Sequence, residues 1–269
     1  MNSPLISVII PIHNCGKYLI ECLDSVVSQT LKDIEIIIVD DASTDASGQT
    51  ADRYAESDAR FRVIHLTESV GAGPARNMAM DEARGEFIAF MDGDDFYPSN
   101  DVLETLYAKA IEKNANVCGG SLRYVNADGT PRTKQLKQQV FEQERWYSYY
   151  EYQYEGGFYR FIYKKIFLEK NNLSFPPLLR FQDSVFFVKT MLKAEIFYAM
   201  PKLTYAYRKG HKEVVWTEEK LIDHMKGVKE LFVIASNYNM TSLSKAMIKN
   251  FFSRVRYMIL FRIFKFFKV

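Results

Sequence analysis

The first hundred residues of the chain alternate short apolar runs with stretches of helical periodicity. Four runs are rich in β-branched and aromatic residues, as strands buried on both faces are: 6–10, 34–39, 61–66 and 87–91. Helical stretches lie between them, so that a new strand begins after about 25 residues. This alternation predicts βαβ units, and therefore an α/β fold with a mostly parallel central sheet flanked by helices.

Local signals place several helix ends. Ser43 or Thr44 is expected to cap a helix that runs to about Tyr54. Pro74 suits the first turn of the next helix, and Gly85 is expected to end it. Further along, 126–129 (Asn-Ala-Asp-Gly) has the composition of a hairpin turn, and helices are predicted over 183–194, 217–237 and 243–268.

These signals divide the chain into three parts. Residues 1–115 carry the regular alternation, residues 116–215 show a looser pattern, and residues 216–269 are expected to form a helical extension. With 48% hydrophobic and 25% charged residues among 269, the composition excludes disorder and collagen-like repeats. Three cysteines without a CxxC pair favour reduced thiols, and the uncharged start of the chain predicts no secretion signal.

Charge is distributed unevenly. No Asp or Glu follows Glu230, whereas seven basic residues do. At 100° per residue, one face of the last predicted helix carries Arg254, Arg262, Lys265 and Lys268. We therefore expect this helix to dock on an anionic membrane surface. Arg256 lies on the opposite side, so a core helix with a fringe of extended basic side chains fits the pattern equally well.

Polar residues follow each of the four predicted strands. They are 11–14 (Pro-Ile-His-Asn), 40–45 (Asp-Asp-Ala-Ser-Thr-Asp), 71–77 (Gly-Ala-Gly-Pro-Ala-Arg-Asn) and 92–95 (Asp-Gly-Asp-Asp). Ligands of open parallel sheets bind at the carboxyl ends of the strands. Carboxylates gathered there repel each other unless a cation or a hydrogen-bond donor stands among them, which indicates a divalent metal and a base.

Each motif also has a structural interpretation. The Asp92–Asp95 run is compatible with an Asp-rich turn, and Asp40 and Asp41 with a helix start. A calcium loop is excluded, because Ala46 stands where the obligatory glycine belongs. A dinucleotide loop is disfavoured because Arg76 occupies the third glycine position. Arg76 can reach a phosphate or form a surface pair with a nearby carboxylate, Asp81 or Glu82.

Taken together, these residues resemble family-two glycosyltransferases of the GT-A fold. The resemblance is densest over residues 5–110, through 7–11 (SVIIP), 35–41 (EIIIVDD), 43–45 (STD), 75–77 (ARN), 83–86 (ARGE) and 92–95 (DGDD). It resumes at 181–187 (FQDSVFF), which is similar to the segment in which the family carries its catalytic base, usually as a Glu-Asp pair followed by an aromatic residue. Here Gln182 replaces that Glu and leaves the base in place.

The resemblance implies a role for each matching residue. Pro11, His13, Asp40 and Asp41 would line the nucleotide pocket, with Asp41 accepting the uracil N–H, and Arg76 would lie near the diphosphate. Asp92 and Gly93 would contact the donor. Residues 1–115 would bind the nucleotide sugar, and residues 116–215 would bind the acceptor and supply the catalytic base. Asp94 would bind Mn²⁺ or Mg²⁺, with Asp92 and His211 as further ligands, and Asp183 would be the catalytic base.

Chemistry supports that assignment independently of the resemblance. Displacement of a nucleoside diphosphate needs its developing charge neutralised, and the acceptor hydroxyl needs a base. Asp183, which opens a predicted helix, can also be a plain N-cap, and His211 a solvent-exposed side chain. The aromatic cluster within 146–154 can be an acceptor platform or core.

The expected activity is inverting, metal-dependent transfer of a hexosyl or N-acetylhexosaminyl group from a UDP-sugar. The acceptor would be a hydroxyl of a glycan or a lipid-linked oligosaccharide, in bacterial surface polysaccharide assembly, with no nucleic-acid partner. We expect a cytoplasmic protein, peripheral on the inner face of the membrane. Alternatives are a nucleotidyltransferase-like enzyme, which would release pyrophosphate, and a non-catalytic nucleotide-sugar-binding module; a dehydrogenase comes last.

Overall fold

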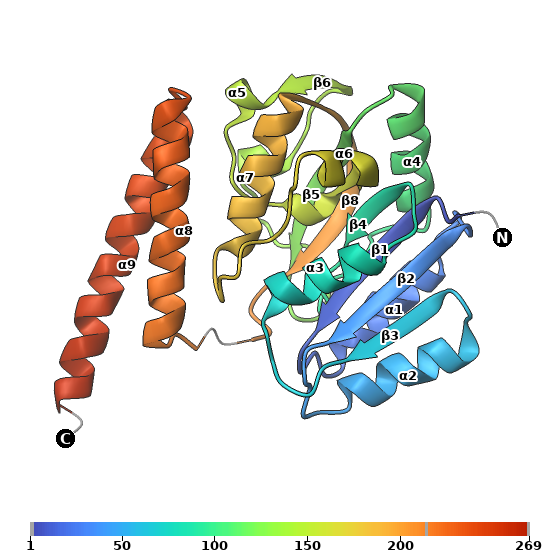
Figure 1. Ribbon diagram of the computed structural model, residues 1–269, viewed down its shortest axis with the longest axis horizontal. Coiled ribbons are helices and arrows are strands. Elements are labelled where there is room, and N and C mark those ends of the chain that lie inside the picture. Colours follow the sequence, from blue (N-terminus) through green and yellow to red (C-terminus); the bar gives the residue numbers. More distant parts are fainter. Residues whose placement is uncertain (1–2, 213–214, 268–269) are drawn as a thin grey trace.

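One mixed sheet organises the part of the chain that the structure describes. The computed structural model covers residues 3–212 and 215–267, and eight strands lie in the order β3-β2-β1-β4-β7-β5-β8-β6 (Figure 1). The strands are β1 (Ile6–Ile12), β2 (Ile34–Asp40), β3 (Phe61–His65), β4 (Phe87–Phe90), β5 (Val117–Val125), β6 (Arg145–Ser148), β7 (Phe161–Lys164) and β8 (Ile196–Arg208). Strands β1 to β4 are parallel, as are β5 and β8, which confirms the predicted α/β fold.

Strand β7 joins the two halves of the sheet. It lies between β4 and β5 and runs antiparallel to both. Gly119 of β5 faces Phe161 of β7 so closely that a Cβ would stand 2.0 Å from the phenyl Cδ1. The sheet therefore runs without a break across residue 115, where the nucleotide and acceptor parts were divided by role.

Helices cover both faces of this sheet. They are α1 (Tyr18–Val27), α2 (Ser47–Ser57), α3 (Ala72–Glu82), α4 (Val102–Glu112), α5 (Tyr149–Tyr152), α6 (Lys165–Lys170), α7 (Gln182–Ala194), α8 (Glu218–Asn237) and α9 (Thr241–Phe267), with 3-10 turns η1 (Lys137–Gln139) and η2 (Phe158–Arg160). Alternate β1 residues enter different cores: Ile9 packs with residues of α3 and α7, whereas Val8 and Ile10 pack with residues of α1 and α4.

Two predicted helix ends are wrong. Helix α2 begins at Ser47 rather than after Ser43 or Thr44, because those residues serve the loop after β1: the Ser43 hydroxyl accepts from Asn14 N, and Thr44 N donates to Asn14 Oδ1. Helix α3 ends at Glu82, before Gly85. Gly85 instead lies against β1, where a Cβ would stand 2.5 Å from the Ser7 nitrogen.

The C-terminal extension is a pair of packed helices. Helix α8 stands beside α7, and α9 packs on α8, at the left of Figure 1. The guanidinium of Arg254 lies over the Trp216 ring, 4.3 Å from its centroid, so it does not belong to a free basic face. The side chains of Arg262 and Lys265, and all of Lys268, lie outside the described part of the chain. None of the helices in that part combines the length and hydropathy needed to cross a membrane.

Candidate functional site

Asp92, the first carboxylate of the loop after β4, is paired with an arginine from α3. Arg76 Nη2 donates to Asp92 Oδ1 at 2.5 Å. Burial raises the pKa of Asp92; the charge of Arg76 opposes this rise, and the charges of Asp94 and Asp183 add to it. Asp183 therefore lies close enough to Asp92 for the two carboxylates to interact, although about 90 residues separate them in the sequence.

Asp94 is held in the charged form. Its Oδ2 lies 2.8 Å from His211 Nε2 and 3.0 Å from Lys212 Nζ. Burial alone would raise the pKa of Asp94, but the hydrogen bond from His211 and the charge of Lys212 outweigh it and lower the pKa to about 2. The carboxylate of Asp94 is thus ionised across the whole physiological range of pH.

His211 is not the solvent-exposed side chain of the alternative interpretation. Its side chain is 9% exposed, and its ring meets the Tyr18 ring edge-on at 4.9 Å. The Nδ1 atom is buried without a hydrogen-bond partner among the described residues. His211 and Asp94, predicted to act together, therefore lie in direct contact.

Asp95, the third carboxylate of the loop, holds the loop to β8. It is 1% exposed and accepts from Tyr205 Oη at 2.9 Å and from Arg208 N at 2.6 Å. Burial and the neighbouring carboxylates raise the pKa of Asp95 well above its ordinary range. Sequence reasoning missed both partners, because nothing in the chain marks β8 as the neighbour of residues more than 100 positions earlier.

Arg208, the last residue of β8, also contacts this loop. Its Nε donates to the Asp94 carbonyl at 2.9 Å, and its guanidinium forms an ion pair with Glu21. The Tyr18 and Phe96 rings lie 4.9 and 5.2 Å from Arg208 Cζ. The sequence does contain a signal for this role of Arg208: it ends a strand rich in aromatic residues and stands just before Gly210 and His211.

Arg76 is a buried residue of the site and not a surface residue. It is 4% exposed, and its guanidinium lies 5.0 Å from the Phe158 ring and 5.2 Å from the Phe175 ring. The alternative surface pair with Asp81 or Glu82 is therefore wrong. Its Nε and Nη1 atoms are buried with no partner in the described part of the chain, which leaves donors for an anion.

Asp41 joins the ends of β1 and β2 to the loop before α3. Its carboxylate accepts from Ser69 Oγ at 2.7 Å, Val70 N at 2.6 Å and Gly71 N at 3.0 Å. Its carbonyl lies 2.6 Å from Nδ1 of the exposed His13. The polar residues that follow three different strands thus meet at one edge of the sheet, as the sequence predicted.

Asp40 and Gly93 have structural contacts of their own. Asp40 is buried, accepts from Ser43 N at 3.0 Å, and lies 3.2 Å from His65 Nδ1. Gly93 does not have a positive φ; instead, a Cβ there would stand 2.8 Å from Cys15 Sγ. The close approach of this loop to the end of β1, and not a left-handed backbone conformation, requires a glycine at this position. Pro11 is buried in β1.

Asp183 lies in the first turn of α7, which begins at Gln182. The N-cap is Phe181, with φ +72°, so Asp183 is not the N-cap that the structural interpretation required. Gln182 packs on α3, because a Cβ at Gly73 would stand 2.9 Å from its Cγ. Burial raises the pKa of the half-buried Glu155, and the charge of Asp183 adds to the rise. Sequence reasoning did not single out Glu155.

Half of the aromatic cluster, Tyr147, Tyr149 and Tyr152, lies in or packs against the core. Tyr149 is fully buried, and Tyr147 stacks on Phe197 with ring centroids 5.7 Å apart. Trp146 and Tyr150 are more than a third exposed. Core packing therefore explains a large part of this stretch, and an acceptor platform would have to use the remaining rings.

Two carboxylates and an imidazole are the donor types that Mn²⁺ accepts. Within residues 3–212 and 215–267 no three His, Cys, Asp or Glu side chains are grouped as a metal site. The ionised Asp94 and His211 Nε2, which lie 2.8 Å apart, nevertheless fit a cation, which would replace the contact between them and compete with Lys212 for Asp94 Oδ2.

The family follows from a comparison with known sequences. The model of glycosyl transferase family 2 matches residues 7–172, more than half of the chain. The chain belongs to glycosyltransferase family 2. Glycosyltransferase GlyG of Streptococcus pneumoniae is 46% identical over 128 residues, which cover 47% of this chain and 42% of GlyG. The uncharacterized glycosyltransferase EpsJ of Bacillus subtilis is 35% identical over 214 residues, covering 77% of this chain and 62% of EpsJ.

Solved structures agree on the fold. S. aureus TarS 1–349, in complex with UDP-GlcNAc, superposes with a TM-score of 0.71 at 24% identity, covering 85% of this chain and 66% of TarS 1–349. The predicted GT-A fold is thereby confirmed. The chain spans about half the length of the curated relatives it matches.

Proposed function

We propose that this chain is an inverting, metal-dependent glycosyltransferase of bacterial surface polysaccharide assembly. It would move a hexosyl or N-acetylhexosaminyl group from a UDP-sugar to a hydroxyl of a glycan or lipid-linked acceptor. The observation that carries the proposal is the pairing of Arg76 with Asp92 beside Asp94 at one edge of the sheet, where the charge of Asp183 also acts on the Asp92 carboxyl. Such a transfer needs a positive group that can bind the diphosphate, a carboxylate that can bind a metal ion and a carboxylate that can act as a base. Arg76, Asp94 and Asp183 have these properties.

The nucleotide would bind beside Asp41. Three donors already reach its carboxylate, which can accept about four hydrogen bonds, so one acceptor position remains for the N3–H of uracil. Cytosine has no proton at N3, and this difference favours a uridine nucleotide. The TarS complex with UDP-GlcNAc supports the same class of donor.

Asp94 and His211 would hold the divalent cation, with Asp92 beside them. When bound, Mn²⁺ or Mg²⁺ would neutralise charge that develops on the leaving diphosphate. The chain's own contribution there is Arg76: its buried Nε and Nη1 donors lie in a region shielded from water, where a hydrogen bond to a phosphate oxygen is strong.

Asp183 would remove the proton from the acceptor hydroxyl. The oxygen of that hydroxyl then forms a bond to the anomeric carbon while the bond from this carbon to the diphosphate breaks, so the configuration inverts. The proton stays on the Asp183 carboxylate and UDP leaves. Gln182, packed on Gly73, and Phe181, in its left-handed conformation, fix the position of this carboxylate relative to the nucleotide half.

Asp183→Asn tests the proposal. The amide has nearly the shape of the carboxylate but cannot take a proton, so we expect turnover to fall by at least about 10²-fold while UDP-sugar affinity stays within a few-fold. Asp81→Asn, an exposed carboxylate of α3, is the matched control and should keep wild-type turnover. Wild-type turnover by Asp183→Asn would show that Asp183 is not the base.

Product analysis separates the alternatives. Release of UDP with a new glycosidic bond supports transfer, whereas release of pyrophosphate would identify a nucleotidyltransferase-like enzyme. A non-catalytic module would bind the nucleotide sugar and release neither product. The proposed place of action is the cytoplasmic face of the membrane, with the protein bound peripherally to it.

A further inference from the structure

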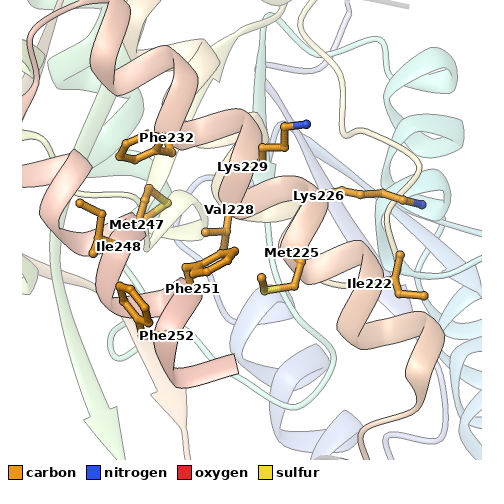
Figure 2. Close-up of a pocket in the computed structure, with 10 residues that line it drawn as sticks. All are labelled: Ile222, Met225, Lys226, Val228, Lys229, Phe232, Met247, Ile248, Phe251 and Phe252. Atoms are coloured by element: carbon orange, nitrogen blue, oxygen red, sulfur yellow. The ribbon is translucent and has the colours of Figure 1, made fainter. Parts of the chain in front are cut away.

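An apolar groove runs between the two C-terminal helices. It has a volume of about 580 Å³ and shares no lining residue with the site described above. Figure 2 shows Met225 and Val228 of α8 facing Phe251 of α9 across it. Its other lining residues are Ile222, Lys226, Lys229, Phe232, Met247, Ile248 and Phe252.

The groove opens onto an unusually apolar surface. Phe252 is 65% exposed, and Ile222, Phe232, Ile248 and Phe251 are each between 39% and 46% exposed. Single exposed apolar side chains are ordinary, but a contiguous set on two facing helices marks an interaction surface.

Basic side chains lie among these apolar residues at helical spacing. On α8, Ile222, Lys226, Lys229 and Val233 follow one another at intervals of four, three and four residues, so they share one stripe of the helix. In Figure 2 the ammonium groups of Lys226 and Lys229 point away from α9.

The same arrangement occurs on α9. Lys245 and Arg256 are seven residues before and four residues after Phe252, so they flank this ring along the same stripe. All three are exposed. Residues 231–269 contain no acidic residue that could cancel the charges of Lys245 and Arg256.

We propose that this groove is the surface through which the chain binds an anionic lipid bilayer. Phe251 and Phe252 enter the acyl region, an acyl chain occupies the groove, and Lys229, Lys245 and Arg256 contact the headgroup phosphates. The inference specifies the membrane contact of the proposed function and assigns it to α8 and the first half of α9.

Charge decides between a bilayer and a second copy of the chain. A second copy seated on the groove would bring Lys229, Lys245 and Arg256 against the same basic residues of its neighbour. An anionic bilayer offers the opposite charge to the basic residues and an apolar interior to the rings. Lys226 is paired with Asp223 at 2.9 Å, so it adds less to this attraction.

Flotation with vesicles tests the assignment. The full chain should float with phosphatidylcholine vesicles that contain phosphatidylglycerol, far less with phosphatidylcholine alone, and less again in 0.5 M salt. The double variant Phe251→Ser/Phe252→Ser should lose at least about tenfold in affinity, since two exposed rings no longer enter the bilayer. Lys229→Gln/Lys245→Gln should lose roughly tenfold at low salt.

Matched controls use residues of the same type elsewhere. Ile166→Ser, at a side chain 47% exposed on α6, and Lys193→Gln, at an exposed lysine of α7, should bind vesicles like the wild type. Failure of the wild type to float, or unchanged binding by both double variants, would overturn the proposal. So would sedimentation that shows a dimer without lipid which Phe251→Ser/Phe252→Ser converts to a monomer.

The result is independent of the enzymatic proposal. Vesicle binding without transfer of any nucleotide sugar would leave the membrane contact standing and contradict the proposed function. Transfer to a water-soluble acceptor by a protein that does not float would do the reverse.

Discussion

Arg76→Met isolates the electrostatic role of the buried pair with Asp92. The methionine keeps apolar volume between the Phe158 and Phe175 rings but removes the cation 2.5 Å from Asp92 Oδ1. Removal of one partner of a buried ion pair costs about 3–5 kcal/mol when the other stays charged. Because a quarter of the Asp92 side chain is exposed, we expect the lower end, about 3 kcal/mol, at pH 8.

The cost should depend on pH, because Asp92 can escape it by binding a proton. Burial already raises the pKa of this carboxyl, and loss of Arg76 raises it further. An acid whose pKa is higher in the folded than in the unfolded state stabilises the fold at low pH and loses that contribution as the pH rises. The destabilisation by Arg76→Met should therefore be smaller at pH 5 than at pH 8. We expect roughly 1 kcal/mol at pH 5, less than half of the value at pH 8.

Urea unfolding followed by circular dichroism at both pH values measures this difference. In the Asp92→Asn background, Arg76→Met should cost the same free energy at pH 5 and pH 8, since the titrating group is gone. Equal costs in the wild-type background, or a pH dependence that survives in the double variant, would refute the reasoning.

Three further variants follow from contacts in and around the site. Gly93→Ala should lower the free energy of unfolding by about 1–3 kcal/mol, because the new Cβ would stand 2.8 Å from Cys15 Sγ; an unchanged urea midpoint would contradict this packing role. Burial and two nearby arginines lower the pKa of His224 to about 4. The free energy of unfolding of the wild type should therefore fall by about 3 kcal/mol as the pH drops from 6.5 to 4, because the buried imidazole must then bind a proton. Urea unfolding of His224→Gln should not show this loss. Asp94→Ala should abolish the effect of Mn²⁺ on UDP affinity in calorimetry, and full transfer activity in excess EDTA would argue against a metal.

The sequence predicts the first four strands well because each is a short apolar run bounded by polar turns. It also places Asp41, Arg76 and Asp94 correctly at one edge, since the ends of parallel strands meet there by geometry. What periodicity cannot supply is pairing between distant segments. Nothing local indicates that β7 inserts between β4 and β5, or that Tyr205 anchors Asp95.

Local propensity fails where a side chain has a better partner far away. Ser43 is a good N-cap by residue type, yet its hydroxyl is used by Asn14 in the loop after β1. Gly85 is a good helix terminator by residue type, yet it lies two residues beyond the C-cap of α3. A glycine is required there because the backbone comes too close to Ser7 for a Cβ. In both cases a contact with β1 or the loop that follows it determines the conformation.

The position of β7 also has a consequence for the order in which the chain folds. Strands β1 to β4 are complete at Phe90, but the strand that covers the free edge of β4 begins only at Phe161. During synthesis, that edge presents unpaired backbone groups until some 70 further residues have left the ribosome. Pairing so distant in sequence closes slowly, and a nascent chain at this stage offers a sheet edge to other chains or to chaperones.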